Sequence, residues 1–129
     1  MSDDERDEPR VRSRDESHDA GYVTAEAALV IPVLVLITGM LLWGVMVACA
    51  QIQCEDAARA GARAAARSET PGAVGVVARS AAPRGARVAL TRDGDLVRVR
   101  VDAASPGVGP LTVGLRGEAA ALAEETVGR

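Results

Sequence analysis

The chain has 129 residues with one Trp, one Tyr and no Phe, and its formal net charge is −3. This length fits one small folded unit rather than several domains. Its 15 basic residues, all Arg, are outnumbered by 18 acidic ones, and few aromatic side chains are available to stack on bases. The composition therefore excludes the usual kind of nucleic-acid-binding protein.

Residues 1–21 form a polar leader that carries eight acidic residues and four Arg. A segment with so few apolar side chains cannot bury enough surface to fold, so we expect it to be disordered. His18, the only His in the chain, lies here. In such surroundings a solvated side chain is a better expectation than a metal ligand or a proton carrier.

Residues 27–50 form an apolar run of 24 residues without a single charge. A helix of about 20 such residues crosses a hydrocarbon core of roughly 30 Å. The alternative of a cleaved secretory signal fits poorly, because the run is too long and no polar break follows a small-residue cleavage site. The sequence therefore predicts one transmembrane helix, with the lipid bilayer as its partner.

Two residues mark the entrance to this run. Glu26 is the last charge before it, and Gly21 lies five residues earlier. One interpretation is that Gly21 belongs to a loop and Glu26 complements the positive end of a helix dipole, an effect of about 0.3–1 kcal/mol. The other rests on a resemblance. Together with V-T-A-E-A-A-L at 23–29, Pro32 and D-A-A-R-A-G-A-R at 56–63, this junction resembles the prepilin processing site of the TadE-like minor pilins, or pseudopilins, of tight-adherence pilus systems.

The resemblance implies a cut by a prepilin peptidase between Gly21 and Tyr22. Glu26 would become the fifth residue of the mature chain and would act in assembly, pairing with the new ammonium group on Tyr22 of a neighbouring subunit. The implied partners are other pilin-like subunits and the pilus assembly machinery. The Arg residues on the two sides of the run are balanced, so the positive-inside rule does not decide the orientation of the helix. The orientation is therefore taken from the resemblance, which implies a cytoplasmic leader and an exported C-terminal part. Pro32 predicts a bend in the helix.

The helix is expected to continue beyond the membrane to residue 67, because residues 51–67 are strong helix formers. Its small residues Ala57, Gly61 and Ala65 recur every four positions and form a stripe that lets another element approach closely. This stripe is interpreted either as a packing surface, against the head or against other subunits, or as part of an ordinary Ala-rich helix whose other face carries solvated Arg side chains.

Cys49 and Cys54 are the two cysteines, and they lie five residues apart on this helix. That spacing puts them on different faces, too far apart to form a disulfide with each other. Two cysteines give neither a disulfide framework nor a metal site. Both are expected to be small buried apolar residues, and an intersubunit disulfide through Cys54 stays open.

Residues 68–129 are expected to form a small exported head. Pro71 and Gly72 end the long helix, and 73–82 is predicted to be a short helix. Apolar residues then alternate at 88–90 and 96–102, around a hairpin signal at Asp93–Gly94.

Within the second of these strands, Val97, Val99 and Val101 should face inward, whereas Arg98 and Arg100 should face water. Residues 111–122 are predicted to form a third strand, although the Ala-rich part could also be helical. The predicted fold class is therefore α+β, with a long transmembrane and stalk helix over 22–67 followed by an antiparallel three-stranded head.

The sequence contains no catalytic constellation, metal-ligand cluster or phosphate-binding glycine loop. We therefore expect no enzyme activity, no cofactor and no small-molecule substrate. The predicted function is that of a single-pass membrane protein processed into a minor pilin. The alternatives are an uncleaved single-pass protein whose exported head binds a partner, and a pseudopilin that serves secretion.

Overall fold

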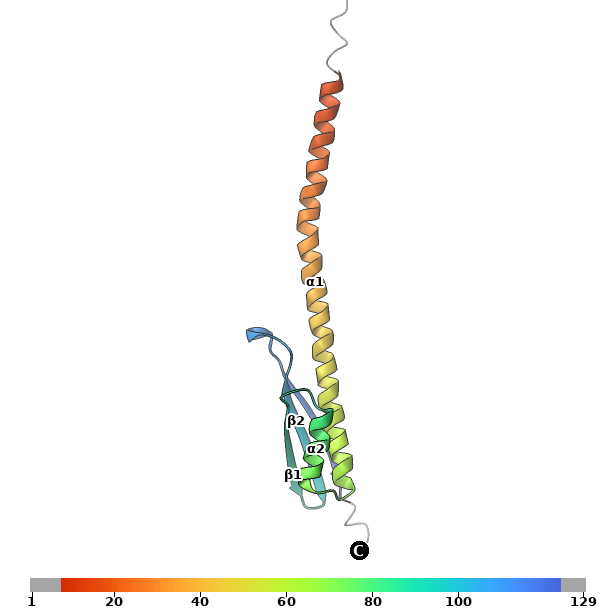
Figure 1. Ribbon diagram of the computed structural model, residues 1–129, viewed down its shortest axis with the longest axis vertical. Helices are drawn as coiled ribbons and strands as arrows, with labels where there is room; N and C mark the ends of the chain where they lie inside the picture. The colour runs from red at the N-terminus through yellow and green to blue at the C-terminus, as the bar shows by residue number, and fades with distance from the viewer. Residues whose placement is uncertain (1–7, 124–129) are drawn as a thin grey trace, which may run out of the picture. The chain divides into compact units, whose positions relative to one another are not determined.

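A computed structural model describes residues 8–123 (Figure 1). The chain divides between Leu41 and Leu42 into two units, each taken by itself below. The elements follow in the order α1 (Glu8–Ala66), α2 (Pro71–Ala81), β1 (Arg87–Asp93), β2 (Leu96–Ala104), the short 3-10 helix η1 (Gly109–Leu111) and β3 (Gly114–Leu122). A long apolar helix followed by a three-stranded antiparallel sheet confirms the predicted α+β class.

The first unit contains the N-terminal part of α1. The prediction of a disordered leader over 1–21 is wrong for residues 8–21, which are helical; residues 1–7 lie outside the described part. Each residue that is added to an existing helix forms one further backbone hydrogen bond. A helix that forms in the apolar run can therefore extend into the polar segment before it. Pro9 falls in the first turn, where its missing N–H has no intrahelical partner to lose. α1 also continues through Pro32, and the bend expected there stays a prediction.

The second unit contains the rest of α1, α2 and the sheet, whose strand order is β1-β2-β3. β1 and β2 form the predicted hairpin, with Leu90 opposite Val99 and Asp93 opposite Leu96. Gly94 turns the chain with a φ of 58°, a left-handed conformation that glycine adopts without strain.

The third strand begins three residues later than the sequence predicts. Residues 111–113 are not in β3, because the chain around Pro110 closes the 3-10 turn η1, in which Leu111 N–H donates to Val108 and Thr112 N–H to Gly109. The Ala-rich part, for which a helix was the alternative, is a strand. Its pairing with β2 places Ala119 opposite Val99.

The core lies between one face of the sheet and the two helices. Val97, Val99 and Val101 are buried there, and Arg98 and Arg100 are exposed on the other face, as predicted. Pro71, which was expected to end the long helix, is also the first residue of α2. Proline is well suited to this position, because the backbone N–H that it lacks would have no partner within the helix. The Thr70 side chain caps α2 by accepting from Ala73 N–H.

One face of α1 packs against this sheet along its whole second half. Its residues alternate in spacings of four and three, the spacing that keeps side chains on one helical stripe. Trp43 and Val47 are half-buried and the rest are buried. We call these residues the α1 seam: Trp43, Val47, Ala50, Cys54, Ala57, Gly61 and Ala64.

Candidate functional site

Every residue of α1 from 16 to 42 is exposed. α1 is the one helix in the described part of the chain that is long and apolar enough to cross a membrane, and none of its most apolar window is buried. Its large side chains remain uncovered, for example Leu29 at 72% and Leu36 at 65% exposure. Apolar surface of this extent indicates contact with lipid or with other chains.

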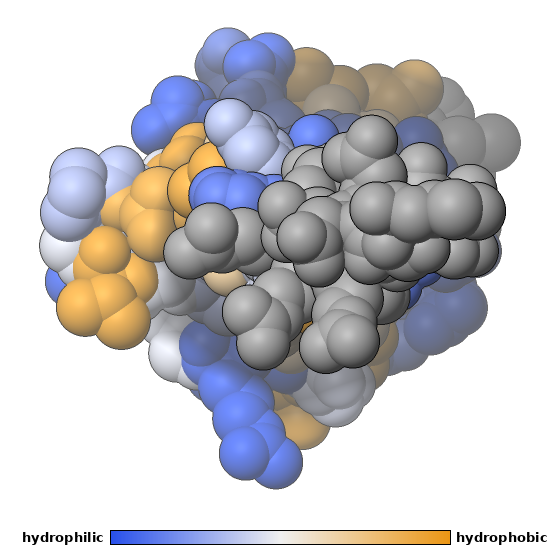
Figure 2. Space-filling model, turned by 90° about the horizontal axis from the view of Figure 1, so that it is seen from above, coloured by the Kyte–Doolittle hydropathy of each residue, from blue (hydrophilic) through white to orange (hydrophobic). Residues whose placement is uncertain are grey.

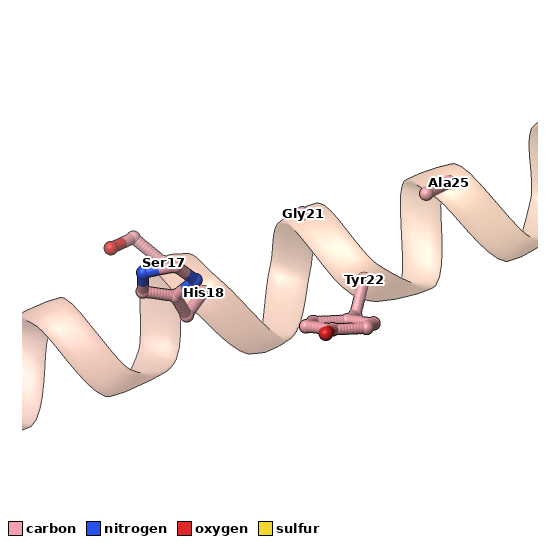
Figure 3. A pocket seen from close by; sticks show the side chains of 5 residues that line it. All are labelled: Ser17, His18, Gly21, Tyr22 and Ala25. Atoms are coloured by element: carbon pink, nitrogen blue, oxygen red, sulfur yellow. The ribbon is translucent and has the colours of Figure 1, made fainter.

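The predicted processing site lies just before this surface, inside the helix (Figure 3). Ser17, His18, Gly21, Tyr22 and Ala25 line a shallow, open depression. A Cβ atom on Gly21 would have nothing within 4 Å, so the space beside this residue is open. The junction between Gly21 and Tyr22 is therefore accessible from outside the helix.

The backbone at this junction is helical, which affects how an enzyme could reach it. Thr24 lies on one side of the junction, and its Oγ1 donates to the carbonyl of Ala20 on the other side at 2.9 Å. Cleavage at this junction, which stays a prediction, would require the helix to open. Glycine in a helix interior is less stable than alanine by about 1 kcal/mol, and Gly21 therefore makes this opening easier.

Glu26 is the only charged residue between Asp19 and Glu55. Its side chain is exposed, and within residues 8–123 it makes no ion pair or hydrogen bond. The dipole interpretation does not fit this position, because α1 begins at Glu8 and the dipole effect fades within the first turn. Glu26 is a carboxylate at the edge of an apolar surface, where a missing partner is costly.

The stripe of Ala57, Gly61 and Ala65 faces the sheet and α2 in this chain. Ala57 and Ala65 are at most 6% exposed. A Cβ on Gly61 would lie 3.0 Å from Val99 Cγ1 and 3.2 Å from Ala78 Cβ, tight enough to push these elements apart. The stripe therefore brings α1 close to its own head.

The Arg residues on the other face of this helix segment are exposed. Arg59 lies 3.7 Å from Glu55 and 3.8 Å from Asp56, and Arg67 lies 2.9 Å from Glu69. Exposed pairs of this kind add little to stability. This face is solvated, and it carries no cluster that would indicate a ligand site.

The two cysteines differ in environment. Cys54 is fully buried, whereas Cys49 is exposed, so the prediction that both are buried is wrong for Cys49. Cys49 falls outside the α1 seam, on a face that the sheet does not cover. Burial raises the pKa of the Cys54 thiol, with smaller contributions from the charges of Asp102 and Glu55. A disulfide from Cys54 to a neighbour would require α1 to separate from the sheet.

The sequence reasoning missed three contacts that hold the head to α1. Gly117 packs against the backbone of Cys54, where a Cβ would collide with the carbonyl. Gln51 Nε2 donates to Arg116 O, and Trp43 Nε1 to Pro106 O, each at 2.9 Å. The sequence did contain a signal for these contacts. The spacing of four and three residues that defines the α1 seam continues from the small-residue stripe back to Trp43, and it indicates one packed face of the helix.

The part of the chain that the structure describes holds no group of three or more His, Cys, Asp or Glu side chains placed to bind a metal ion. The features that remain are an apolar helix surface, an accessible Gly–Tyr junction and one carboxylate without a partner.

Comparisons with known proteins agree with these features. The family described as TadE-like protein matches residues 21–63, which include Gly21, Tyr22, Glu26 and Pro32. The Mycobacterium tuberculosis protein named Apoptosis inhibitor Rv3655c is 42% identical over 104 residues, which cover 81% of this chain and 82% of that protein. No solved structure matches the chain. The chain therefore belongs to the TadE-like family of pilus-related proteins, with one candidate membrane span.

Proposed function

We propose that the protein is a minor pilin or pseudopilin, processed by a prepilin peptidase between Gly21 and Tyr22 and held in the membrane by residues 27–50 before assembly. The observation that carries this proposal is the unpartnered carboxylate of Glu26, five residues after an accessible glycine and directly before an exposed apolar helix. The protein acts as a structural subunit and catalyses no reaction.

Cleavage supplies the partner that Glu26 lacks. A cut after Gly21 leaves an α-ammonium group on Tyr22, and in a bundle of such helices this cation can approach Glu26 of a neighbouring subunit. Opposite charges attract strongly where water is excluded, and an unpaired charge there is costly. The charge pair therefore favours addition of a subunit in the correct register.

The proposed organisation follows from this cut. Residues 1–21 are a cytoplasmic leader that is removed, 22–67 are the transmembrane and stalk helix, and 68–129 are an exported head. The apolar surface of the helix contacts lipid before assembly and other pilin-like subunits afterwards. The assembly machinery extracts the subunit from the bilayer, and the proline at position 32 aids that step by weakening the helix locally.

The first test is the intact mass and N-terminal sequence of the protein from membranes of its native host. A chain that begins at Tyr22 is expected. Gly21→Ala should block the cut, because it adds a side chain at the junction and stabilises the helix that must open. Gly39→Ala is the matched control: it is the same change in the same helix, with nothing within 4 Å of the new Cβ, and processing should be normal.

The second test separates processing from assembly. Glu26→Gln keeps the side-chain shape and removes the charge, so the chain should still be cut but should be depleted from sheared pili. Glu16→Gln is the control, because Glu16 is also an exposed glutamate of α1 but is removed with the leader. Normal incorporation of the Glu26→Gln subunit would contradict the assembly role.

Two other outcomes lead to the alternative functions. A native chain that still carries residues 2–21 indicates an uncleaved single-pass protein whose exported head binds a partner. A chain that begins at Tyr22 but never enters filaments indicates a pseudopilin that serves secretion.

A further inference from the structure

The loop between β2 and β3, residues 105–113, is apolar and exposed. No charged residue occurs from 103 to 115. Val108 is 85% exposed, Leu111 56% and Val113 42%. Single exposed apolar residues are ordinary, but three on one short uncharged loop form a patch that indicates an interaction surface.

This loop lies beside the last turns of the apolar run. Trp43 Nε1 donates to Pro106 O at 2.9 Å, and Trp43 is part of residues 27–50. In Figure 1 the loop extends from the end of the sheet opposite the β1–β2 hairpin. Figure 2 shows apolar atoms, in orange, on the side where Figure 1 places the loop.

Charged residues mark a common border for the loop and the helix. Asp102 and Arg116 flank the uncharged segment and form an ion pair at 2.7 Å. Gln51 of α1 donates to Arg116 O, and the next charge along α1 is Glu55. The uncharged loop therefore begins near the level where the uncharged part of α1 ends. Arg84 lies at the same level, where it lines a hollow together with Met46, Cys49 and Pro106.

The length of the apolar run places this border at the membrane surface. About 20 residues span the hydrocarbon core, and if they start directly after Glu26 they end at Met46. Trp43 then lies in the last turn inside the core boundary, a depth at which tryptophan is enriched. The loop tied to Trp43 lies at the same depth.

The loop backbone is suited to the headgroup side of this boundary rather than to the hydrocarbon, because unsatisfied peptide groups are costly away from water. Pro106 and Pro110 have no N–H. Of the other seven N–H groups in residues 105–113, four have acceptors inside the loop: those of Ser105, Leu111, Thr112 and Val113. The carbonyl of Pro106 accepts from Trp43.

We propose that, before assembly, residues 105–113 insert into the headgroup–hydrocarbon boundary of the exported leaflet, so that the head is held against the bilayer by a second contact besides its helix. The proposal rests on the membrane span of the proposed function, because the loop continues the surface of that span. Its contact is with lipid, and it does not depend on cleavage at Gly21.

The test uses the full chain in phosphatidylcholine vesicles with and without bromine atoms on the acyl chains, which quench fluorophores that reach them. An environment-sensitive fluorophore is attached to Val108→Cys in a Cys49→Ala background. Cys54 stays in place, because it is buried and its failure to react shows that the head is folded. Val45→Cys, on the exposed face of the span, and Asp95→Cys, at the β1–β2 hairpin, are the matched controls.

The expected result is loss of emission at positions 108 and 45 and none at 95. Quenching at 45 without quenching at 108 would overturn the loop proposal and leave the span intact. A blue-shifted label at 108 that bromine does not quench would mean that another copy of the chain covers the loop, which also overturns it. Failure to quench at 45 would overturn the span, and with it both proposals.

Discussion

The two halves of α1 use apolar residues in opposite ways. From 16 to 42 every side chain is exposed, and the apolar ones there are mostly large. Along the α1 seam the buried residues are Ala, Cys and Gly, and the sheet lies directly on them. Large side chains give more contact with lipid tails or neighbouring chains, whereas small ones let a sheet approach the helix backbone. Side-chain size therefore distinguishes the two kinds of partner within one helix.

Leu36→Arg should have the largest effect, and it acts on the exposed half. Replacing leucine by arginine at the centre of a membrane helix costs about 3–4 kcal/mol of insertion free energy. The inserted fraction, measured by glycosylation mapping in microsomes, should fall sharply. Ile52→Arg, also exposed but beyond the apolar run, should insert normally. Equal insertion of both variants would show that residues 27–50 are not the span.

Gly117→Ala tests the second half of α1, where the α1 seam packs against the sheet. The variant should lose about 3 kcal/mol of unfolding free energy, because the new Cβ would collide with the backbone of α1, which cannot move aside. The measurement is the urea midpoint of the full chain in detergent. Gly114→Ala is the matched control in the same strand, with nothing within 4 Å of its Cβ. A Gly117→Ala protein as stable as the control would mean that α1 and β3 are not in direct contact.

The same change in both halves of α1 makes the comparison direct. Gly61→Val should destabilise the head by about 2 kcal/mol through overpacking against Val99 and Ala78. Gly39→Val meets nothing within 4 Å, so the urea midpoint should not change. If both variants unfold at the wild-type midpoint, the seam is not packed.

The smallest effect concerns thiol reactivity. The protein is treated in detergent with a small maleimide at about pH 8, near the ordinary thiol pKa, and the adducts are counted by mass. The folded protein should gain one adduct, at Cys49, and the urea-unfolded protein should gain two. Burial raises the pKa of Cys54. Folding therefore favours its neutral thiol, and this contribution to stability is present below the unfolded pKa and lost as the pH rises through the folded one. Two adducts on the folded chain would contradict the burial.

The parts of the fold that follow from the sequence are those that depend on local pattern. The uncharged run at 27–50 predicts the exposed helix, and the alternation of Val97, Val99 and Val101 predicts the buried face of β2. The hairpin at Asp93–Gly94 follows from turn chemistry. These patterns act over a few residues, so they can be read without knowledge of distant contacts.

The parts that could not be predicted depend on what lies elsewhere in the chain. Residues 8–21 are polar, and their helix is a continuation of the apolar one. Cys49 is exposed and Cys54 buried because only one face of α1 meets the sheet, a matter of tertiary packing. Of the candidate site, Gly21 and Glu26 were predicted from their spacing together with the family resemblance, and their roles stay predictions, whereas the absence of any partner for Glu26 within residues 8–123 required the structure.

The contact of Gly117 with the backbone of Cys54 has a mechanical consequence. Side chains between a helix and a sheet can tilt or change rotamer and so absorb a displacement, but two touching backbones have no such compliance. A tensile load applied along the second half of α1 therefore passes into β3 without slack. From β3 it passes to β2 through the hydrogen bonds of the sheet, so the head should follow its helix as a stiff body.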